Sequence, residues 1–161
     1  MLPTSAPAVE RIMIMTVKDY LNRGYELQRE IKIKTEQLEN INESMTNLTA
    51  TLDGIKVMKT PTTSSIENGV VRVVELKEDI SSSIARLAII GTEAMLVIKK
   101  LGNLKTESIL IKHYVGFKSW DIIAQEMNMA RKTIINRHYY AILKLEEMLK
   151  DSPLLGDDDV A

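Results

Sequence analysis

The segment Trp120-Asp-Ile-Ile-Ala-Gln-Glu-Met-Asn-Met-Ala-Arg-Lys-Thr-Ile-Ile-Asn-Arg-His-Tyr139 has the pattern of two helices joined by a tight turn. Ser119 is a good N-cap for a short helix over residues 120–127, and Asn128 suits a left-handed residue at the turn. A longer helix is expected from about residue 131 to 149, before Asp151-Ser152-Pro153. The segment therefore predicts a helix-turn-helix.

Apolar residues at helical spacing predict how these two helices pack. Ile123 and Met127 are expected to face inward from the first helix, and the small Ala124 lies where the helices cross. Met129 fills the turn, and Ile134 anchors the second helix in the core. The same buried stripe is predicted to continue through Ala141, Leu145 and Met148.

A further short helix is predicted just upstream, over residues 105–114 and ended by Gly116, which completes a three-helix domain over residues 104–150. From Lys105 to Lys150 there are eight Lys and Arg residues and five acidic residues, so this part carries +3 and the rest of the chain −4. A mildly basic segment is compatible with nucleic acid, and equally with a solvated helix surface.

The N-terminal part has a heptad rhythm that predicts one long helix over residues 16–58. Ten of twelve positions spaced by three and four residues are apolar or aromatic, with Gly24 and Lys34 as the exceptions. A helix this long cannot bury its stripe alone and needs a partner. The seam positions are Val17, Tyr20, Gly24, Leu27, Ile31, Lys34, Leu38, Ile41, Met45, Leu48, Leu52 and Ile55.

A segment rich in Thr, Ser, Pro and Gly, residues 59–69, reads as a linker before a second long helix over residues 70–101. The stripe expected on that helix consists of Ile80, Ile84, Leu87, Gly91, Ala94, Ile98 and Leu101. An antiparallel hairpin of the two long helices is the economical arrangement, and pairing between two chains stays open. Residues 1–15 are predicted to be flexible, and residues 151–161 form an acidic tail.

The sequence as a whole predicts an all-α fold, with long coiled-coil-type helices followed by a C-terminal trihelical helix-turn-helix domain. The 161 residues contain no cysteine, which excludes disulfides, thiolate nucleophiles and Cys zinc sites and favours the cytoplasm. Arg86 and Glu93 interrupt the longest apolar stretch, residues 84–98, so no membrane span is expected. His113 and His138 have no acidic residues at ligand spacing, and no catalytic arrangement is recognisable. We therefore expect no metal, no cofactor and no enzyme.

The candidate DNA-contacting residues lie around the predicted turn. A recognition helix places its first residues against base edges, where Arg and Lys suit guanine and Asn suits adenine. Residues predicted to read bases are Arg131, Lys132, Thr133, Ile135 and Asn136. Residues predicted to contact the DNA backbone are Lys118, Ser119, Arg137, Tyr140 and Lys144.

Two further side chains have two interpretations each. Trp120 is a core anchor or a base-stacking platform, with the core favoured. His138 packs beside Ile134 and Ala141, or touches a phosphate. Of the tyrosines, Tyr114 is expected in the core.

The pattern Leu110-x-x-His-Tyr-x-x-Phe-x-Ser-Trp-x-x-Ile-Ala-x-x-Met-x-Met, followed by Thr-Ile-x-Asn-Arg-His-x-x-Ala-Ile-x-Lys-Leu, resembles phage-encoded regulators of the RinA/ArpU type. These regulators in turn resemble region 4 of bacterial sigma factors. The resemblance implies a phage or prophage transcription regulator that activates late genes and acts with RNA polymerase. Ala130 departs from the pattern, because a Ser or Thr cap is usual there, and so does His113, where Arg is common.

Two classes of function are compatible with this sequence. In the first, the chain binds double-stranded DNA and forms a homo-oligomer through its long helices in a bacterial host. In the second, the same C-terminal helices bind RNA polymerase or another regulator and never contact DNA. The sigma-like pattern favours the first class, and the absence of a strongly basic patch favours the second.

Overall fold

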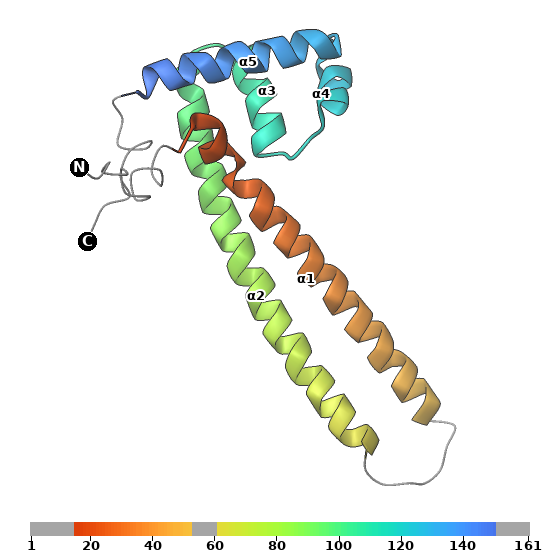
Figure 1. The fold of residues 1–161 in the computed structure, drawn as a ribbon. Coiled ribbons are helices and arrows are strands. Elements are labelled where there is room, and N and C mark those ends of the chain that lie inside the picture. The colour runs from red at the N-terminus through yellow and green to blue at the C-terminus, as the bar shows by residue number, and fades with distance from the viewer. Residues whose placement is uncertain (1–14, 53–60, 151–161) are drawn as a thin grey trace, which may run out of the picture. The chain divides into compact units, whose positions relative to one another are not determined.

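The computed structural model describes residues 15–52 and 61–150, with side chains at 15–51 and 64–150. Every regular element in these ranges is helical (Figure 1). The elements are α1 (Val17–Leu52), α2 (Pro61–Ile98), the 3₁₀ turn η2 (Lys99–Leu101), α3 (Leu104–Tyr114), α4 (Trp120–Met127) and α5 (Arg131–Met148). The prediction of an all-helical chain with long helices is confirmed for these residues. Residues 1–14 and the predicted acidic tail lie outside them.

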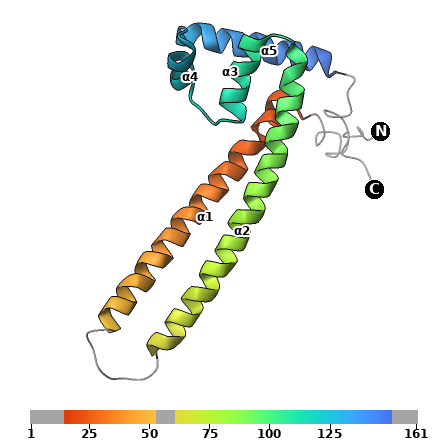
Figure 2. The same cartoon turned by 180° about the vertical axis from the view of Figure 1, so that it is seen from behind.

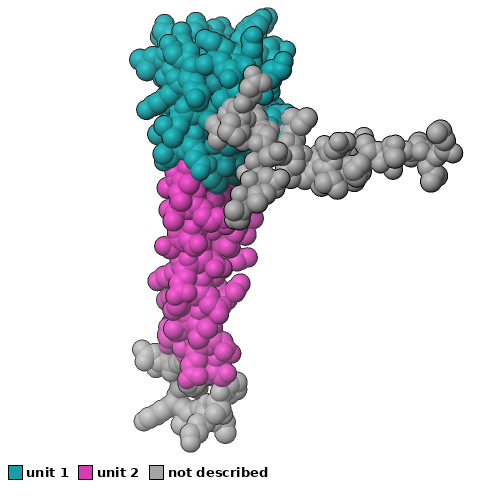
Figure 3. Space-filling model, turned by 90° about the vertical axis from the view of Figure 1, so that its left-hand side faces the viewer, with its two compact units in different colours: residues 1–25, 90–161 teal, residues 26–89 magenta. Residues whose placement is uncertain are grey.

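The chain divides into two units (Figure 3). The hairpin unit consists of residues 26–89, and the core unit consists of residues 1–25 and 90–161. The two long helices contribute to both units: α1 passes from one to the other after Tyr25, and α2 does so after Ile89.

Within the hairpin unit, α1 and α2 lie side by side and run antiparallel (Figures 1 and 2). Lys34 Nζ on α1 is 3.7 Å from Asp79 Oδ2 on α2. Further along, a Cβ placed on Gly69 of α2 would lie 3.0 Å from Met45 Sδ of α1. From the first contact to the second, the residue number rises on α1, from Lys34 to Met45, and falls on α2, from Asp79 to Gly69, as it must in an antiparallel pair. The long helices therefore pair within one chain, a point that the sequence left open.

The predicted heptad seam of α1 is its least exposed face. Leu27 is buried at 6% exposure, and exposure grows toward the far end, where Leu48 reaches 36%. The seam positions between them are partly buried, namely Ile31, Lys34, Leu38, Ile41 and Met45. The predicted seam is thus confirmed through Met45, while its last positions, Leu52 and Ile55, fall outside the described side chains.

The seam of α2 differs from the predicted stripe at one position. Leu76 and Ser83 are buried at 2% and 4% exposure, whereas Ile84 is 52% exposed. The prediction that Ile84 lies on the stripe is wrong, because position 83, not 84, continues the spacing of three and four residues from Leu76 through Ile80 to Leu87. A serine at a seam position hides this register from a search for apolar residues.

The helix α2 also begins earlier than the sequence predicts. Residues 59–69 are predicted to be a linker, but α2 includes everything from Pro61 onward. Proline is favoured at the first position of a helix, where its missing N–H leaves no partner unsatisfied. Gly69 is consequently inside the helix, against Met45 of α1. The linker prediction is therefore wrong from Pro61 onward, and residues 53–60 lie outside the described ranges.

In the core unit, α3, α4 and α5 pack around one apolar cluster. The ends of the long helices contribute to it through Leu21 and Ile98, which are almost completely buried. The predicted stripe of α5 is confirmed at Ala141 and Leu145 but is wrong at Met148, which is 48% exposed. Four residues after Leu145 the inward position is Leu149, and that side chain is buried at 4% exposure.

One described helix, Ser64–Leu101, is long and apolar enough to cross a membrane, judged by length and composition alone. Its most apolar window has a mean hydropathy of 1.4, and 17% of that window is buried. The core helix of a water-soluble protein passes the same test, so length and composition do not distinguish the two. The expectation that no segment spans a membrane stays a prediction.

Candidate nucleic-acid interface

The turn between α4 and α5 has the local geometry that its residues predict. Ser119 precedes α4 in an extended conformation, and its hydroxyl accepts the N–H of Ile122 at 3.4 Å. Asn128 ends α4 in the left-handed region, with φ of 53°, and donates its N–H to the carbonyl of Gln125 at 3.2 Å. Both predictions are confirmed. Ala130 precedes α5 without a side-chain cap, because its methyl group has no acceptor to offer.

The contact between α4 and α5 is formed by the predicted apolar residues. Ile123 and Ile134 are completely buried, and Ala124 between them is 8% exposed. Met127 and Met129 are partly buried and pack against the same cluster. A small residue at the crossing lets the two backbones approach closely. Buried contacts thus fix the position of α5, and the residues on its outer face are not needed for packing.

The first turns of α5 carry the residues predicted to read bases. Arg131, Lys132, Thr133 and Asn136 are exposed, whereas Ile135 is partly buried. Cationic, hydroxyl and amide groups therefore lie together at the exposed start of one helix. These are the groups that pair with base edges in the major groove.

Arg131 already has a carboxylate partner. Its Nε lies 2.9 Å from Asp121 Oδ1 of α4, and the two side chains are 58% and 72% exposed. An ion pair this exposed contributes little to folding and is readily exchanged for another partner. Arg131 can therefore leave Asp121 for a ligand at small cost.

Two of the residues predicted to contact the DNA backbone, Lys118 and Ser119, already bond to other residues of the chain. Lys118 forms an ion pair with Glu126, which Lys112 shares. Hydrogen bonds from Lys112 and Lys118 hold the pKa of Glu126 below its usual range. The hydroxyl of Ser119 serves as the cap of α4. The sequence predicts the cap at Ser119, but it does not indicate the ion pairs of Glu126, which join α4 to Lys112 of α3 and to Lys118 just before α4.

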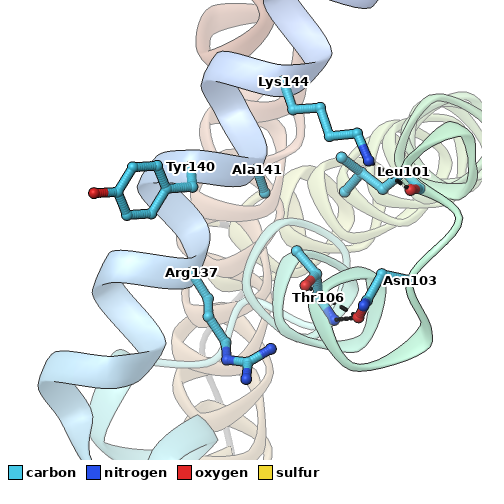
Figure 4. Close-up of a pocket in the computed structure, with 7 residues that line it drawn as sticks. All are labelled: Leu101, Asn103, Thr106, Arg137, Tyr140, Ala141 and Lys144. Carbon is cyan, nitrogen blue, oxygen red and sulfur yellow. Dashed lines mark hydrogen bonds between the residues drawn. The ribbon is translucent and has the colours of Figure 1, made fainter.

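The other three predicted backbone residues, Arg137, Tyr140 and Lys144, line a single pocket (Figure 4). Its opposite wall comes from the end of η2 and the start of α3, and its volume is about 230 Å³. Figure 4 shows the hydroxyl of Tyr140 pointing away from the other lining side chains. Arg137 and Lys144 therefore line the same pocket, but their charged groups lie at different ends of it, with the Lys144 ammonium at Leu101, and the Tyr140 hydroxyl points away from both (Figure 4).

The core unit also contains a cluster of aromatic and histidine side chains. The ring of His113 stacks on Trp120, with centroids 3.8 Å apart, and its Nδ1 is 2.9 Å from the carbonyl oxygen of Lys118. Tyr25 of α1 donates its hydroxyl to the carbonyl of His113 at 2.8 Å. Trp120 is thus a packing residue, as the favoured interpretation has it. Sequence reasoning missed Tyr25, which lies 88 residues away along the chain.

His138 belongs to the same cluster. Its Nε2 lies 2.6 Å from the hydroxyl oxygen of Tyr114, and the Tyr114 side chain is buried at 2% exposure, as predicted. Burial is the main cause that lowers the pKa of His138 to about 4, and burial also lowers the pKa of His113. Both imidazoles are therefore neutral at physiological pH. Of the two interpretations of His138, the structure favours internal packing.

Among the described residues, no group of His, Cys, Asp or Glu is placed to hold a metal ion. Comparison with known proteins finds no matching family model, no matching curated protein and no matching solved structure. The function is therefore inferred from the residues and their geometry.

Proposed function

We propose that this chain is a DNA-binding transcription regulator that reads duplex DNA through α4, the turn and α5, used as a helix-turn-helix. The observation that carries the proposal is the exposed start of α5, where Arg131, Lys132, Thr133 and Asn136 stand clear of the buried contact with α4. A recognition helix enters the major groove with its first residues against base edges. Arg131 and Lys132 suit guanine, and Asn136 suits adenine.

The distribution of charge supports the same proposal. Residues 105–150 carry a net charge of +3 within a chain of −1, so the positive charge is concentrated in the part that holds α3 to α5. Phosphate contacts supply much of the affinity of a DNA-binding protein and orient it on the duplex. Lys118, Arg137 and Lys144 are the cations assigned to that task.

The resemblance to RinA/ArpU-type regulators and to sigma region 4 supports a more specific role. We assign the chain to a phage or prophage, as an activator of late genes that contacts RNA polymerase in the bacterial cytoplasm. The proposal includes self-association through the long helices. It assigns the chain no catalytic residue and no cofactor.

A second candidate is a protein-interaction module that uses the same helices without DNA. Two observations favour it. Arg131 and Lys118 already have carboxylate partners, and α5 exposes apolar surface at Tyr139 and Leu143, which are 58% and 44% exposed. Aromatic and aliphatic groups of this kind are typical of the centre of a protein–protein interface.

Equilibrium binding to labelled duplexes separates the two candidates. The duplexes are a sequence enriched from a random pool and its scrambled counterpart, at two salt concentrations. Arg131→Ala and Asn136→Ala should each weaken binding to the enriched sequence by about 1–3 kcal/mol. Asn40→Ala, an exposed and uncharged residue of the hairpin unit, is the matched control and should change neither affinity.

Two results would decide against the first candidate. A chain that stays folded but has no salt-dependent affinity for any duplex does not bind DNA. Capture of purified RNA polymerase that Leu143→Ala weakens, and that Asn136→Ala leaves unchanged, would support the interaction module instead.

A further inference from the structure

The pocket beside α5 lies wholly within the core unit and has walls of different chemistry. One wall is α5, with Arg137, Ala141 and Lys144, and the other is formed by Leu101 at the end of η2 and by Thr106 of α3 (Figure 4). The ammonium of Lys144 reaches across and donates to the carbonyl oxygen of Leu101 at 3.3 Å. The Lys144 ammonium therefore links the α5 wall to the wall formed by η2 and α3.

The polar groups at the start of α3 already have hydrogen-bond partners. Asn103 Oδ1 accepts the N–H of Thr106 at 3.1 Å and the Thr106 hydroxyl at 3.2 Å. The amide that caps the helix is thus in use, and the side chains of α5 remain as the charged groups available to a ligand. The binding capacity of this pocket comes from those side chains rather than from the helix end.

The pocket holds two cations and no carboxylate among its lining residues. Arg137 is partly buried and has neither a hydrogen bond nor an ion pair with any residue in the part of the chain that the structure describes. Lys144 has a neutral carbonyl as its hydrogen-bond partner. A partly buried guanidinium gains most from an anionic acceptor, because water is partly excluded around it.

The donors in the pocket match a phosphate better than a carboxylate. Arg137 can donate two parallel hydrogen bonds, and Lys144 adds a point charge from the same helix. The Thr106 hydroxyl can turn from Asn103 to provide a further donor. A tetrahedral anion with several acceptor oxygens can use all three groups once the two long side chains turn toward Thr106, and the volume of about 230 Å³ leaves room for it.

We infer that this pocket holds one backbone phosphate of duplex DNA, and that the side chains of Arg137 and Lys144, which lie at different ends of the pocket without a ligand, turn toward each other to bind it with help from Thr106. The inference rests on the proposed function and makes it more specific. Tyr140, whose hydroxyl points away, is left out of this site, contrary to its assignment from the sequence.

The salt dependence of DNA binding reports how many phosphates the protein neutralises. It therefore tests whether Arg137 and Lys144 bind the same phosphate. Each neutralised phosphate contributes about 0.9 to the slope of log affinity against log salt. The double variant Arg137→Gln/Lys144→Gln should flatten the slope by about 0.9 in total, because both cations serve the same phosphate. Two separate phosphates would give a loss of about 1.8. Lys32→Gln/Lys77→Gln, at two exposed lysines of the hairpin unit, controls for the loss of two positive charges.

A second arm changes the DNA instead of the protein, so it does not depend on how well a variant folds. Each phosphate of the enriched duplex is replaced in turn by a neutral methylphosphonate. One position should weaken binding of the unaltered protein as much as the double variant does. The same replacement should leave binding of the double variant unchanged.

The failures of the inference and of the proposed function are distinguishable. If the unaltered protein has no salt-dependent affinity for DNA, both fall. If it binds DNA and the double variant keeps the full slope, or loses about 1.8, the shared site is wrong and the proposed function stands. Inorganic phosphate provides the last arm, followed by NMR at the Thr106 amide. If millimolar phosphate shifts the Thr106 amide signal to saturation while DNA alone does not shift it, the pocket binds a small anion and the inference is overturned.

Discussion

Among single residues, an acidic side chain of the candidate interface bears on the DNA binding that we propose. Asp121 lies at the exposed edge of α4 and pairs with Arg131, a residue assigned to base reading. A nearby carboxylate repels phosphate and also competes for the guanidinium. If Arg131 contacts a base as we propose, its ion pair with Asp121 has to open first.

Replacing that carboxylate should strengthen DNA binding. Asp121→Asn keeps the shape of the side chain and removes its charge. We expect affinity for duplex DNA to rise by a few-fold at low salt, in line with the roughly 0.2–1 kcal/mol of an exposed ion pair, and the gain to shrink at high salt. Titration of a labelled duplex at two salt concentrations measures it. An unchanged or weakened affinity at low salt would show that Arg131 does not approach DNA.

The histidine pair predicts how stability depends on pH. The pKa of His138 is about 4 in the folded chain, below the value of about 6.5 for a free histidine, so folding favours its neutral form. Its contribution to stability is complete above pH 6.5 and is lost as the pH falls toward 4. The pKa of His113 is lowered as well and adds in the same direction.

Thermal unfolding between pH 7 and pH 5 tests this dependence before most carboxylates titrate. The melting temperature of the unaltered chain should fall over that range. His138→Gln keeps a group that can accept a hydrogen bond from Tyr114 but does not titrate, so its melting temperature should fall less. Equal slopes for the two proteins would show that His138 is not held neutral by the fold.

At the scale of elements, the sequence predicted the helices better than their registers and partners. The seam of α1 was visible because a spacing of three and four residues recurs over many turns. In α2 the buried position is Ser83, a residue that carries no apolar signal, so neighbouring Ile84 was assigned to the stripe instead. Pro61 belongs to the Thr-, Ser-, Pro- and Gly-rich composition that predicts a linker, although the first position of a helix accepts proline.

The candidate interface shows the same limit. Ser119, Asn128 and the crossing at Ala124 follow from local patterns, and the structure agrees with them. The partners of Arg131 and Lys118 do not, because exposed side chains of either charge have several possible partners and the sequence does not say which of them are within reach. The contact of Tyr25 with His113 depends on how distant segments meet, and no local pattern reports that.

The register of the hairpin makes a prediction about stability. Leu76 is 2% exposed on the seam, so Leu76→Ala should lower the free energy of unfolding by about 2–5 kcal/mol. Val71, on the same helix, is 57% exposed, and Val71→Ala should change it by less than about 0.5 kcal/mol. Denaturant unfolding followed by circular dichroism gives both values. Similar losses for the two variants would mean that α2 buries a different face.

At the scale of the whole molecule, self-association has to use a surface other than the seam, because α1 and α2 use the seam within one chain. Among the described residues, α2 has several large apolar side chains that are about half exposed. They include Val70, Val74 and Ile84, which are 48%, 49% and 52% exposed. We expect the homo-oligomer that we propose to form through these side chains.

Sedimentation equilibrium tests this expectation. The unaltered chain should sediment as a dimer or larger assembly, and Val74→Lys/Ile84→Lys should sediment as a monomer with unchanged helicity, because a lysine at a contact would bury its charge. Glu78→Lys, on the same helix, is the control for added positive charge. A monomer before and after the change would show that the prediction of a homo-oligomer is wrong.

The central claim is that the exposed start of α5 reads a DNA sequence. Selection of bound duplexes from a random-sequence pool tests it most directly, because the operator need not be known beforehand. The account predicts that the unaltered protein enriches one recurring motif that contains an adenine. It also predicts that Asn136→Ala, with its fold intact, loses the preference for that adenine while its non-specific affinity remains. Enrichment of no motif by the folded protein, or of the same motif with the same strength by Asn136→Ala, would show that the start of α5 does not read DNA bases.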